Sequence, residues 1–135
     1  MRFFAFAALI ALVCLPAAAQ DPVKVDPGHY KLIYEDATIR VLRLTFGPRE
    51  KSVMHEHPFG TCEIFLTEFH GKSTDPAGEV TTEDHEPGEV ACDPVRPGVH
   101  RHLPENIADT PFELILIERK PPKGILQAAV ISSGL

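Results

Sequence analysis

Four histidines of this chain occur as two His-x-His pairs, His55 with His57 and His100 with His102. Side chains two residues apart in a β-strand project to the same face, so each pair would present two imidazoles on one side. A neutral imidazole nitrogen is a good ligand for divalent transition metals. One such pair is also compatible with an exposed, solvated strand. The repetition of the spacing beside Pro and Gly instead predicts a metal site where the pairs converge.

A carboxylate that could join this site lies at Glu63, which follows His57 across an expected turn at Pro58–Gly60. A return strand would bring its side chain back beside the histidines, and the alternative is a solvated strand carboxylate. The three remaining histidines fall in expected loops or weakly patterned segments and are interpreted as surface residues: His29, His70 and His85.

The elements that must position these residues are short β-strands, because Pro and Gly separate apolar and β-branched runs at almost every junction. The clearest strand is 37–48, which places Leu42, Leu44 and Phe46 on one face. The strongly apolar run 111–120 is expected at the centre of a sheet. Further strands are expected at 30–35, 52–57, 61–69, 79–85 and 86–94, with a polar turn region at 70–79. These patterns predict an all-β fold.

The 135 residues of the chain can bury one modest core, so we expect a single domain. Residues 1–19 have an early charge at Arg2, an apolar run to Val13 and an Ala-x-Ala ending at Ala19, which is typical of a secretory signal peptide. The apolar run is too short to span a membrane comfortably. We therefore expect a periplasmic or secreted protein with no membrane attachment after cleavage.

Charge and cysteine content narrow the possible partners. The chain has 13 Lys and Arg residues against 19 Asp and Glu residues, for a net charge of −6. An acidic surface lacks the cationic stripe that phosphates require, so no nucleic-acid partner is expected. Without residues 1–19 the chain keeps Cys62 and Cys92, an even count in a compartment that permits disulfides.

Two longer motifs surround the histidine pairs. The first, GPREKSVMHEHPFGTCEIFLTEFHG, runs from Gly47 to Gly71, and the second, GEVACDPVRPGVHRHLPEN, runs from Gly88 to Asn106. With these motifs the chain resembles the small single-domain cupins of the type-2, RmlC-like group, whose jelly-roll barrel is called a double-stranded β-helix. The resemblance implies a cupin domain at 28–120 and a C-terminal extension at 121–135.

The resemblance also implies a metal-ligand set of three histidines and one glutamate: His55, His57, Glu63 and His102. His100 is the alternative to His102. His102 has the family's spacing to Asn106, whereas His100 has the family's short distance from Gly98. The ion would be divalent, with iron, manganese, nickel, zinc and copper all open.

The mouth of such a barrel would be lined by Phe59, Phe65 and Phe112, which suits a small apolar or aromatic ligand. A cupin fold alone gives no reaction, because the same fold hosts dioxygenases, isomerases and non-catalytic proteins. Two functions stay open. One is a metalloprotein that acts on a small oxygenated or aromatic molecule in the manner of a dioxygenase or isomerase. The other is a non-catalytic module that binds a small molecule or a metal.

Two further expectations follow from the resemblance. In a cupin jelly roll the strand after the first histidine pair runs antiparallel to the strand of GEVACDP, which would bring Cys62 within disulfide reach of Cys92. Two buried free thiols are the alternative. Cupins often dimerise through edge strands, so a homodimer is expected, and the extension at 121–135 could cover such an edge or pack as an additional strand or helix.

Overall fold

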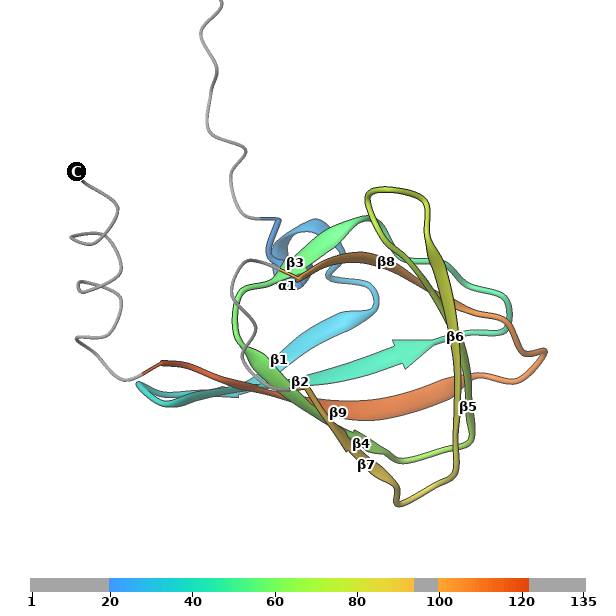
Figure 1. Ribbon diagram of the computed structural model, residues 1–135. Helices are drawn as coiled ribbons and strands as arrows, with labels where there is room; N and C mark the ends of the chain where they lie inside the picture. Colours follow the sequence, from blue (N-terminus) through green and yellow to red (C-terminus); the bar gives the residue numbers. More distant parts are fainter. Residues whose placement is uncertain (1–19, 94–99, 122–135) are drawn as a thin grey trace, which may run out of the picture.

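The strands of the protein form two antiparallel sheets that face each other, as Figure 1 shows for the computed structural model. The structure describes residues 20–93 and 100–121; the expected signal peptide and all but the first residue of the expected extension lie outside them. One sheet has the order β1-β2-β9-β4-β7 and the other β3-β8-β5-β6. The strands are β1 Tyr30–Glu35, β2 Ile39–Phe46, β3 His55–His57, β4 Gly60–Phe65, β5 Phe69–Thr74, β6 Val80–His85, β7 Val90–Cys92, β8 His100–Asn106 and β9 Phe112–Arg119.

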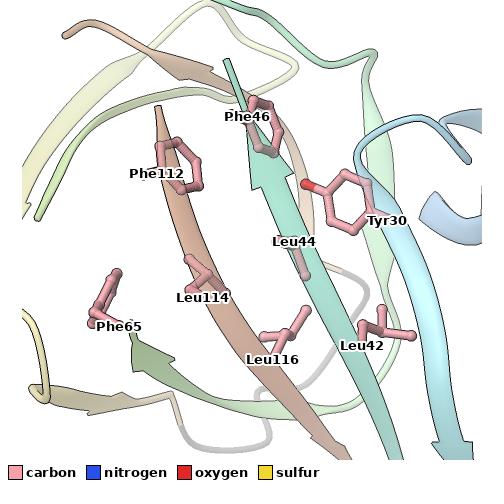
Figure 2. Packing of buried hydrophobic residues seen from close by; sticks show 8 residues of the cluster. All are labelled: Tyr30, Leu42, Leu44, Phe46, Phe65, Phe112, Leu114 and Leu116. Atoms are coloured by element: carbon pink, nitrogen blue, oxygen red, sulfur yellow. The ribbon is translucent and has the colours of Figure 1, made fainter. Parts of the chain in front are cut away.

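The apolar core lies on the inner face of the five-stranded sheet (Figure 2). Strand β9 pairs with β2 on one side and β4 on the other, which confirms its predicted central position. Alternate residues of β9 and β2 point inward, because side chains alternate along a strand. Each buried side chain of this size contributes about 1.5–3 kcal/mol. The core consists of Tyr30, Leu42, Leu44, Phe46, Phe65, Phe112, Leu114 and Leu116.

A short helix, α1 Pro22–Val25, precedes the first strand. Asp21 caps it by accepting a hydrogen bond from the backbone N–H of Val23. No helix among the described residues is both long and apolar enough to span a bilayer.

The prediction of a polar turn at 70–79 is wrong for the first half of that segment, which belongs to strand β5. This strand pairs with β6 on one side and β8 on the other. Its backbone groups are therefore satisfied by two ladders, although Gly71 and Lys72 have weak strand propensity. The turn itself is limited to the residues between β5 and β6, where Asp75 accepts hydrogen bonds from Ala77 and Glu79, and Gly78 has a φ of 87°.

The sheets do not close into the expected barrel. Among the described residues, no ladder of hydrogen bonds joins the five-stranded sheet to the four-stranded one. Strand β3 is an edge strand of the four-stranded sheet and β7 is an edge strand of the five-stranded sheet. Each contains only three residues, so each offers few backbone groups for hydrogen bonds to the other sheet. The sheets face each other as a sandwich, and the edges of β6 and β7 stay unjoined.

Asn106 fastens the end of β8 to the loop that follows β2. Its side chain is fully buried. The Nδ2 amide donates to the carbonyl oxygens of Gly47 and Thr110, and Oδ1 accepts from the backbone N–H of Ala108. The two motifs recognised in the sequence are thus joined at Gly47 and Asn106.

A disulfide joins Cys62 of β4 to Cys92 of β7, which are direct partners in the ladder. The neighbours of Cys62 along β4, Thr61 and Glu63, both line the interior cavity described below. Because side chains alternate along a strand, the disulfide lies on the outer face of the sheet.

The disulfide should stabilise the fold by restricting the unfolded chain. Its sequence separation of 30 residues corresponds to about 3–4 kcal/mol in the chain-entropy model. We expect the Cys62→Ser/Cys92→Ser variant to lose about this much free energy of unfolding in urea titrations. Reduced wild type should match the variant. Thiol titration of the unfolded, unreduced chain without residues 1–19 should find no free thiol, and two per chain would contradict the bridge.

Candidate metal centre

Strands β3 and β8 bring the two His-x-His pairs together on one face of the four-stranded sheet. His55 is directly opposite His102 in the ladder, and His57 is opposite His100. Side-chain nitrogens of His55, His57 and His102 all lie within 4.8 Å of one another. Among the described residues this is the one group of three or more His, Cys, Asp or Glu side chains that is spaced to hold a metal ion.

The rings of His55 and His57 are each oriented through Nδ1. Nδ1–H of His55 donates to the carbonyl oxygen of Val53 at 2.8 Å, and Nδ1–H of His57 donates to Oε1 of Glu118 at 2.7 Å. In a neutral ring the lone pair is then on Nε2. The two Nε2 atoms lie 3.0 Å apart, so two acceptors face each other, an arrangement that a shared cation would stabilise.

His102 completes this cluster. Its Nδ1 lies 3.1 Å from Oγ of Ser73 in β5, whereas its Nε2 is buried without a hydrogen-bond partner. Three imidazoles with oriented Nδ1 atoms, one of which has a buried and unpaired Nε2, fit a divalent metal ion, because neutral imidazoles are its usual protein ligands. His100 is exposed and lies outside the cluster, although its ring stacks edge-on against His102. The structure thus places His102, rather than His100, with the first pair.

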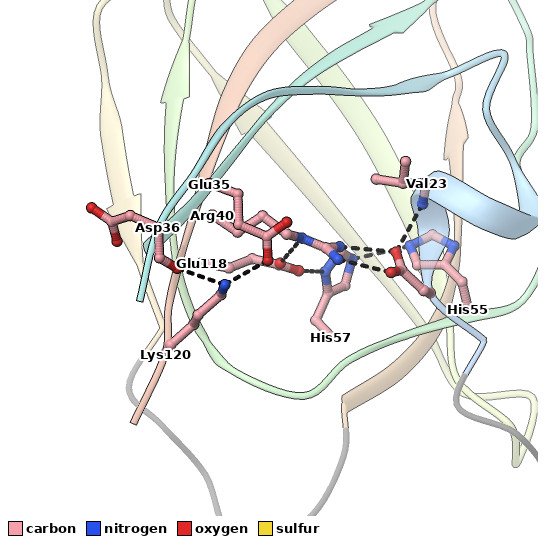
Figure 3. Close-up of polar contacts among 9 residues, drawn as sticks. Val23, Glu35, Asp36, Arg40, His55, His57, Glu118 and Lys120 are labelled. Carbon is pink, nitrogen blue, oxygen red and sulfur yellow. Dashed lines mark hydrogen bonds and ion pairs between the residues drawn. The ribbon is translucent and has the colours of Figure 1, made fainter. Parts of the chain in front are cut away.

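A chain of ion pairs that begins at Glu118 orients the ring of His57, as Figure 3 shows. Glu118 of β9 is fully buried and lies between His57 and Arg40, with its Oε2 at 2.6 Å from Nε of Arg40. The guanidinium of Arg40 also donates two hydrogen bonds to Asp21, at 2.8 and 2.9 Å. Carboxylates that bind the second nitrogen of a ligating histidine fix its tautomer and raise its basicity.

Burial keeps two of the rings neutral. Desolvation, followed by the charge of His57, lowers the pKa of His55 to about 4. Desolvation, followed by the charges of His57 and His55, lowers the pKa of His102 to about 2. Both rings are therefore in the metal-binding form at neutral pH.

A cavity of about 350 Å³ adjoins the cluster between the two sheets. Leu44, Phe46, Phe112, Leu114 and Leu116 of the apolar core line it on the side of the five-stranded sheet. His57 and His102 line it on the side of the four-stranded sheet. A molecule in the cavity would thus contact apolar surface and the histidines together.

The structure does not place Glu63 with the histidine cluster. In β4 the residue opposite Glu118 is Thr61, and Glu63 is opposite Leu116. Glu63 therefore lies one inward-facing position farther along the strand than the level of Glu118. Its carboxylate lines the cavity instead.

The three phenylalanines expected at the cavity mouth have different positions. Phe59 and Phe112 line the cavity. Phe65 is buried in the core, where it stacks on His85 with ring centroids 4.0 Å apart, and it is not among the lining residues. His85 was expected at the surface, and its side chain is instead packed against this core residue.

Sequence reasoning missed Glu118, Arg40 and Ser73, the side chains that orient or support the histidine cluster. A signal for Glu118 was present, because it continues the inward-facing series of Phe112, Leu114 and Leu116 in β9. A carboxylate in such a series must be paired, since burying an unpaired charge is costly. The sequence around Ser73 is polar and was interpreted as a turn, so nothing in it indicated that Ser73 contacts a histidine of the cluster.

Replacing Glu118 should weaken metal binding through His57. We expect Glu118→Gln to lower the affinity for Zn²⁺ by about 10- to 100-fold, as loss of such an orienting carboxylate does elsewhere. Competition with a chromophoric chelator measures this affinity. Glu113→Gln is the matched control, because Glu113 lies on the same strand, also pairs with an arginine, Arg43, and points outward. Affinity of Glu118→Gln within twofold of wild type would contradict the assigned role.

The lowered pKa of His102 should appear in the acid stability of the metal-free protein. Below pH 6.5, the ordinary pKa of the ring, His102 is protonated in the unfolded chain but stays neutral in the folded protein. The free energy of unfolding therefore falls as the pH falls toward the lower pKa of the folded protein. His102→Gln should reduce this loss between pH 6 and 4 by up to roughly 1.4 kcal/mol per pH unit.

Urea unfolding of wild type and variant at several pH values measures the difference. His70 provides a control because its pKa is shifted in the opposite direction. The hydrogen bonds that its ring donates to the carboxylates of Asp84 and Glu68 raise the pKa of His70, so its contribution to stability is present below pH 6.5 and is lost as the pH rises. His70→Gln should steepen the acid loss slightly. Identical pH profiles for wild type and His102→Gln would contradict a neutral, buried ring.

No protein-family model matches the chain, and no curated protein matches it. Solved structures do. A cupin domain from Bordetella pertussis is 22% identical, with a TM-score of 0.60 over 68% of this chain and 92% of that one.

Two other solved structures have similar folds. An RmlC-like cupin with a double-stranded β-helix fold from Methanocaldococcus jannaschii is 14% identical, with a TM-score of 0.55 over 72% of this chain and 84% of that one. A protein with a double-stranded β-helix domain from Klebsiella pneumoniae is 20% identical, with a TM-score of 0.53 over 72% and 82% of the two chains. At these identities the likeness establishes the fold alone: the described strands form the double-stranded β-helix of the cupins.

Proposed function

We propose that this protein holds a divalent metal ion through His55, His57 and His102 and binds a small oxygenated or aromatic molecule in the adjoining cavity. The observation that carries the proposal is the convergence of ring nitrogens from β3 and β8, with the Nε2 atoms of His55 and His57 at 3.0 Å and that of His102 buried and unpaired. A buried ring nitrogen without a hydrogen-bond partner, such as Nε2 of His102, is unusual in proteins, and a bound metal ion would account for it.

The chain's own residues divide the work. The histidines supply three neutral nitrogen donors, and Glu118 keeps the His57 ring turned toward the other two. The apolar side of the cavity excludes water and packs against the carbon skeleton of a ligand. A bound divalent metal would act as a Lewis acid toward an oxygen-bearing ligand. The cavity volume of about 350 Å³ limits that ligand to a small molecule.

Two forms of this function remain, an enzyme that acts like a dioxygenase or isomerase and a non-catalytic binding module. Dioxygen uptake and product formation by the metal-loaded protein, with phenolic, β-diketone and sugar substrates, distinguish them. Turnover that disappears with the metal supports the enzyme. Binding without turnover supports the module.

We also propose that the mature chain works in the periplasm or outside the cell. The signal-peptide pattern at 1–19 supports this location. So does the disulfide between Cys62 and Cys92, because such bonds persist in oxidising compartments.

Metal analysis of mutants tests the metal site directly. We expect one divalent ion per chain in wild type and none in the His55→Ala/His102→Ala variant, because a single remaining imidazole of the cluster cannot hold the ion. Equilibrium dialysis followed by elemental analysis measures the stoichiometry. His70→Ala is the control, since its ring is partly exposed and pairs with Asp84 and Glu68 away from the cluster.

Single variants compare the two histidines of β8. His102→Ala should cost more metal affinity than His100→Ala, because only His102 belongs to the cluster. The opposite order would mean that His100 is the ligand. Stoichiometric metal retained by the double variant, or lost equally in His70→Ala, would overturn the proposed site.

A further inference from the structure

Three carboxylates, Glu63, Glu83 and Asp93, line the cavity from the edge where the sheets are not joined. Glu63 lies on β4, Glu83 on β6 and Asp93 just after β7. The same three residues also line a second hollow of about 320 Å³. This acidic wall therefore lies between the cavity beside the histidines and the gap between β6 and β7.

Glu63 is the member of the acidic wall that faces most deeply inward. It is on the inner face of the five-stranded sheet, and no described residue donates a hydrogen bond to its carboxylate. Burial, followed by the charges of Glu83 and Asp93, raises the pKa of Glu63 to about 7. A cationic partner would relieve both the desolvation and the repulsion between these carboxylates.

The basic groups of the described residues near this wall are already engaged. His85 has its Nδ1 at 3.1 Å from Glu89 and its Nε2 at 3.8 Å from Glu83. Lys72, which also lines the cavity, has its Nζ at 2.9 Å from Glu105. Neither residue is paired with Glu63 in these contacts, so the Glu63 carboxylate presents negative charge to a molecule in the cavity.

The cavity thus combines three kinds of surface: histidine nitrogens on β3 and β8, apolar side chains of the core and the acidic wall. We propose that it selects small molecules that carry a protonated amine beside an apolar or aromatic skeleton and oxygen donors, with Glu63 as the specificity-determining residue that binds the ammonium group. This inference rests on the proposed function, because the oxygen donors face the metal-binding histidines.

The same charges disfavour anionic ligands. A carboxylate or phosphate on the molecule would be placed near Glu63 and Glu83 without a free cation among the described lining residues to balance it. Specificity of this kind comes from repulsion of the wrong ligand as well as attraction of the right one.

Three catechols that differ only in their side chain test the inference on Zn²⁺-loaded protein: dopamine, neutral 4-ethylcatechol and anionic 3,4-dihydroxyphenylacetate. Zinc is chosen because it has no redox chemistry. Calorimetric titration should give dopamine a Kd about tenfold or more below that of 4-ethylcatechol, as one charge-assisted hydrogen bond supplies. The anion should bind most weakly.

Glu63→Gln keeps the shape of the side chain and removes its charge. It should reduce the preference for dopamine over 4-ethylcatechol to within about threefold, leaving the affinities for 4-ethylcatechol and zinc unchanged. Glu83→Gln, at a more exposed position, should reduce the preference partly and provides the test if Glu63→Gln fails to fold. Glu113→Gln, on the outer face, is the control that should keep it.

Equal affinity for dopamine and 4-ethylcatechol, or a preference that survives in Glu63→Gln, would overturn the inference and leave the proposed function standing. Loss of zinc from Glu63→Gln would also overturn it, since Glu63 would then be a metal ligand. Failure of wild type to hold zinc, or to bind any of the three catechols, would overturn the proposed function and the inference with it.

Discussion

The register of β3 against β8 is the constraint on which the candidate metal centre depends. His55 shares its side of the ladder with His102 only in this register, and a shift by one residue would turn every side chain of β3 to the opposite face. One contact in the middle of β3 and one just before it hold this register. Glu56 pairs with Arg101, Nε to Oε1 at 3.0 Å, and the backbone N–H of Ser52 donates to the carbonyl of Pro104.

The site is maintained at some cost in stability. Glu118 and Arg40 are almost completely withdrawn from water, and desolvation of such a pair can exceed the attraction between its members. An apolar residue at position 118 would continue the series of Phe112, Leu114 and Leu116 without that penalty. The carboxylate is therefore better explained by its contact with His57 than by any gain in fold stability.

Most of the fold could be predicted from the sequence because its strands have distinct apolar periodicity. The faces of Leu42, Leu44 and Phe46 and the central position of β9 follow directly from alternation. Strand β5 could not be predicted, since a polar segment becomes a strand only through pairing with two neighbours. The histidine spacing predicted the cluster, but the position of Glu63 depends on the register of β4 against β9, which the residues themselves do not reveal.

The ladder between β3 and β8 also determines when the site can exist during folding. It joins two segments that are far apart in the chain, and the strands between them belong to both sheets. A partly folded chain cannot assemble all three nitrogens, so an ion would bind the native state almost exclusively. By mass action, metal at a hundredfold excess over its Kd would add about 2.7 kcal/mol to the free energy of unfolding. Metal supply in its compartment would thus influence how long each molecule survives proteolysis as well as what it binds.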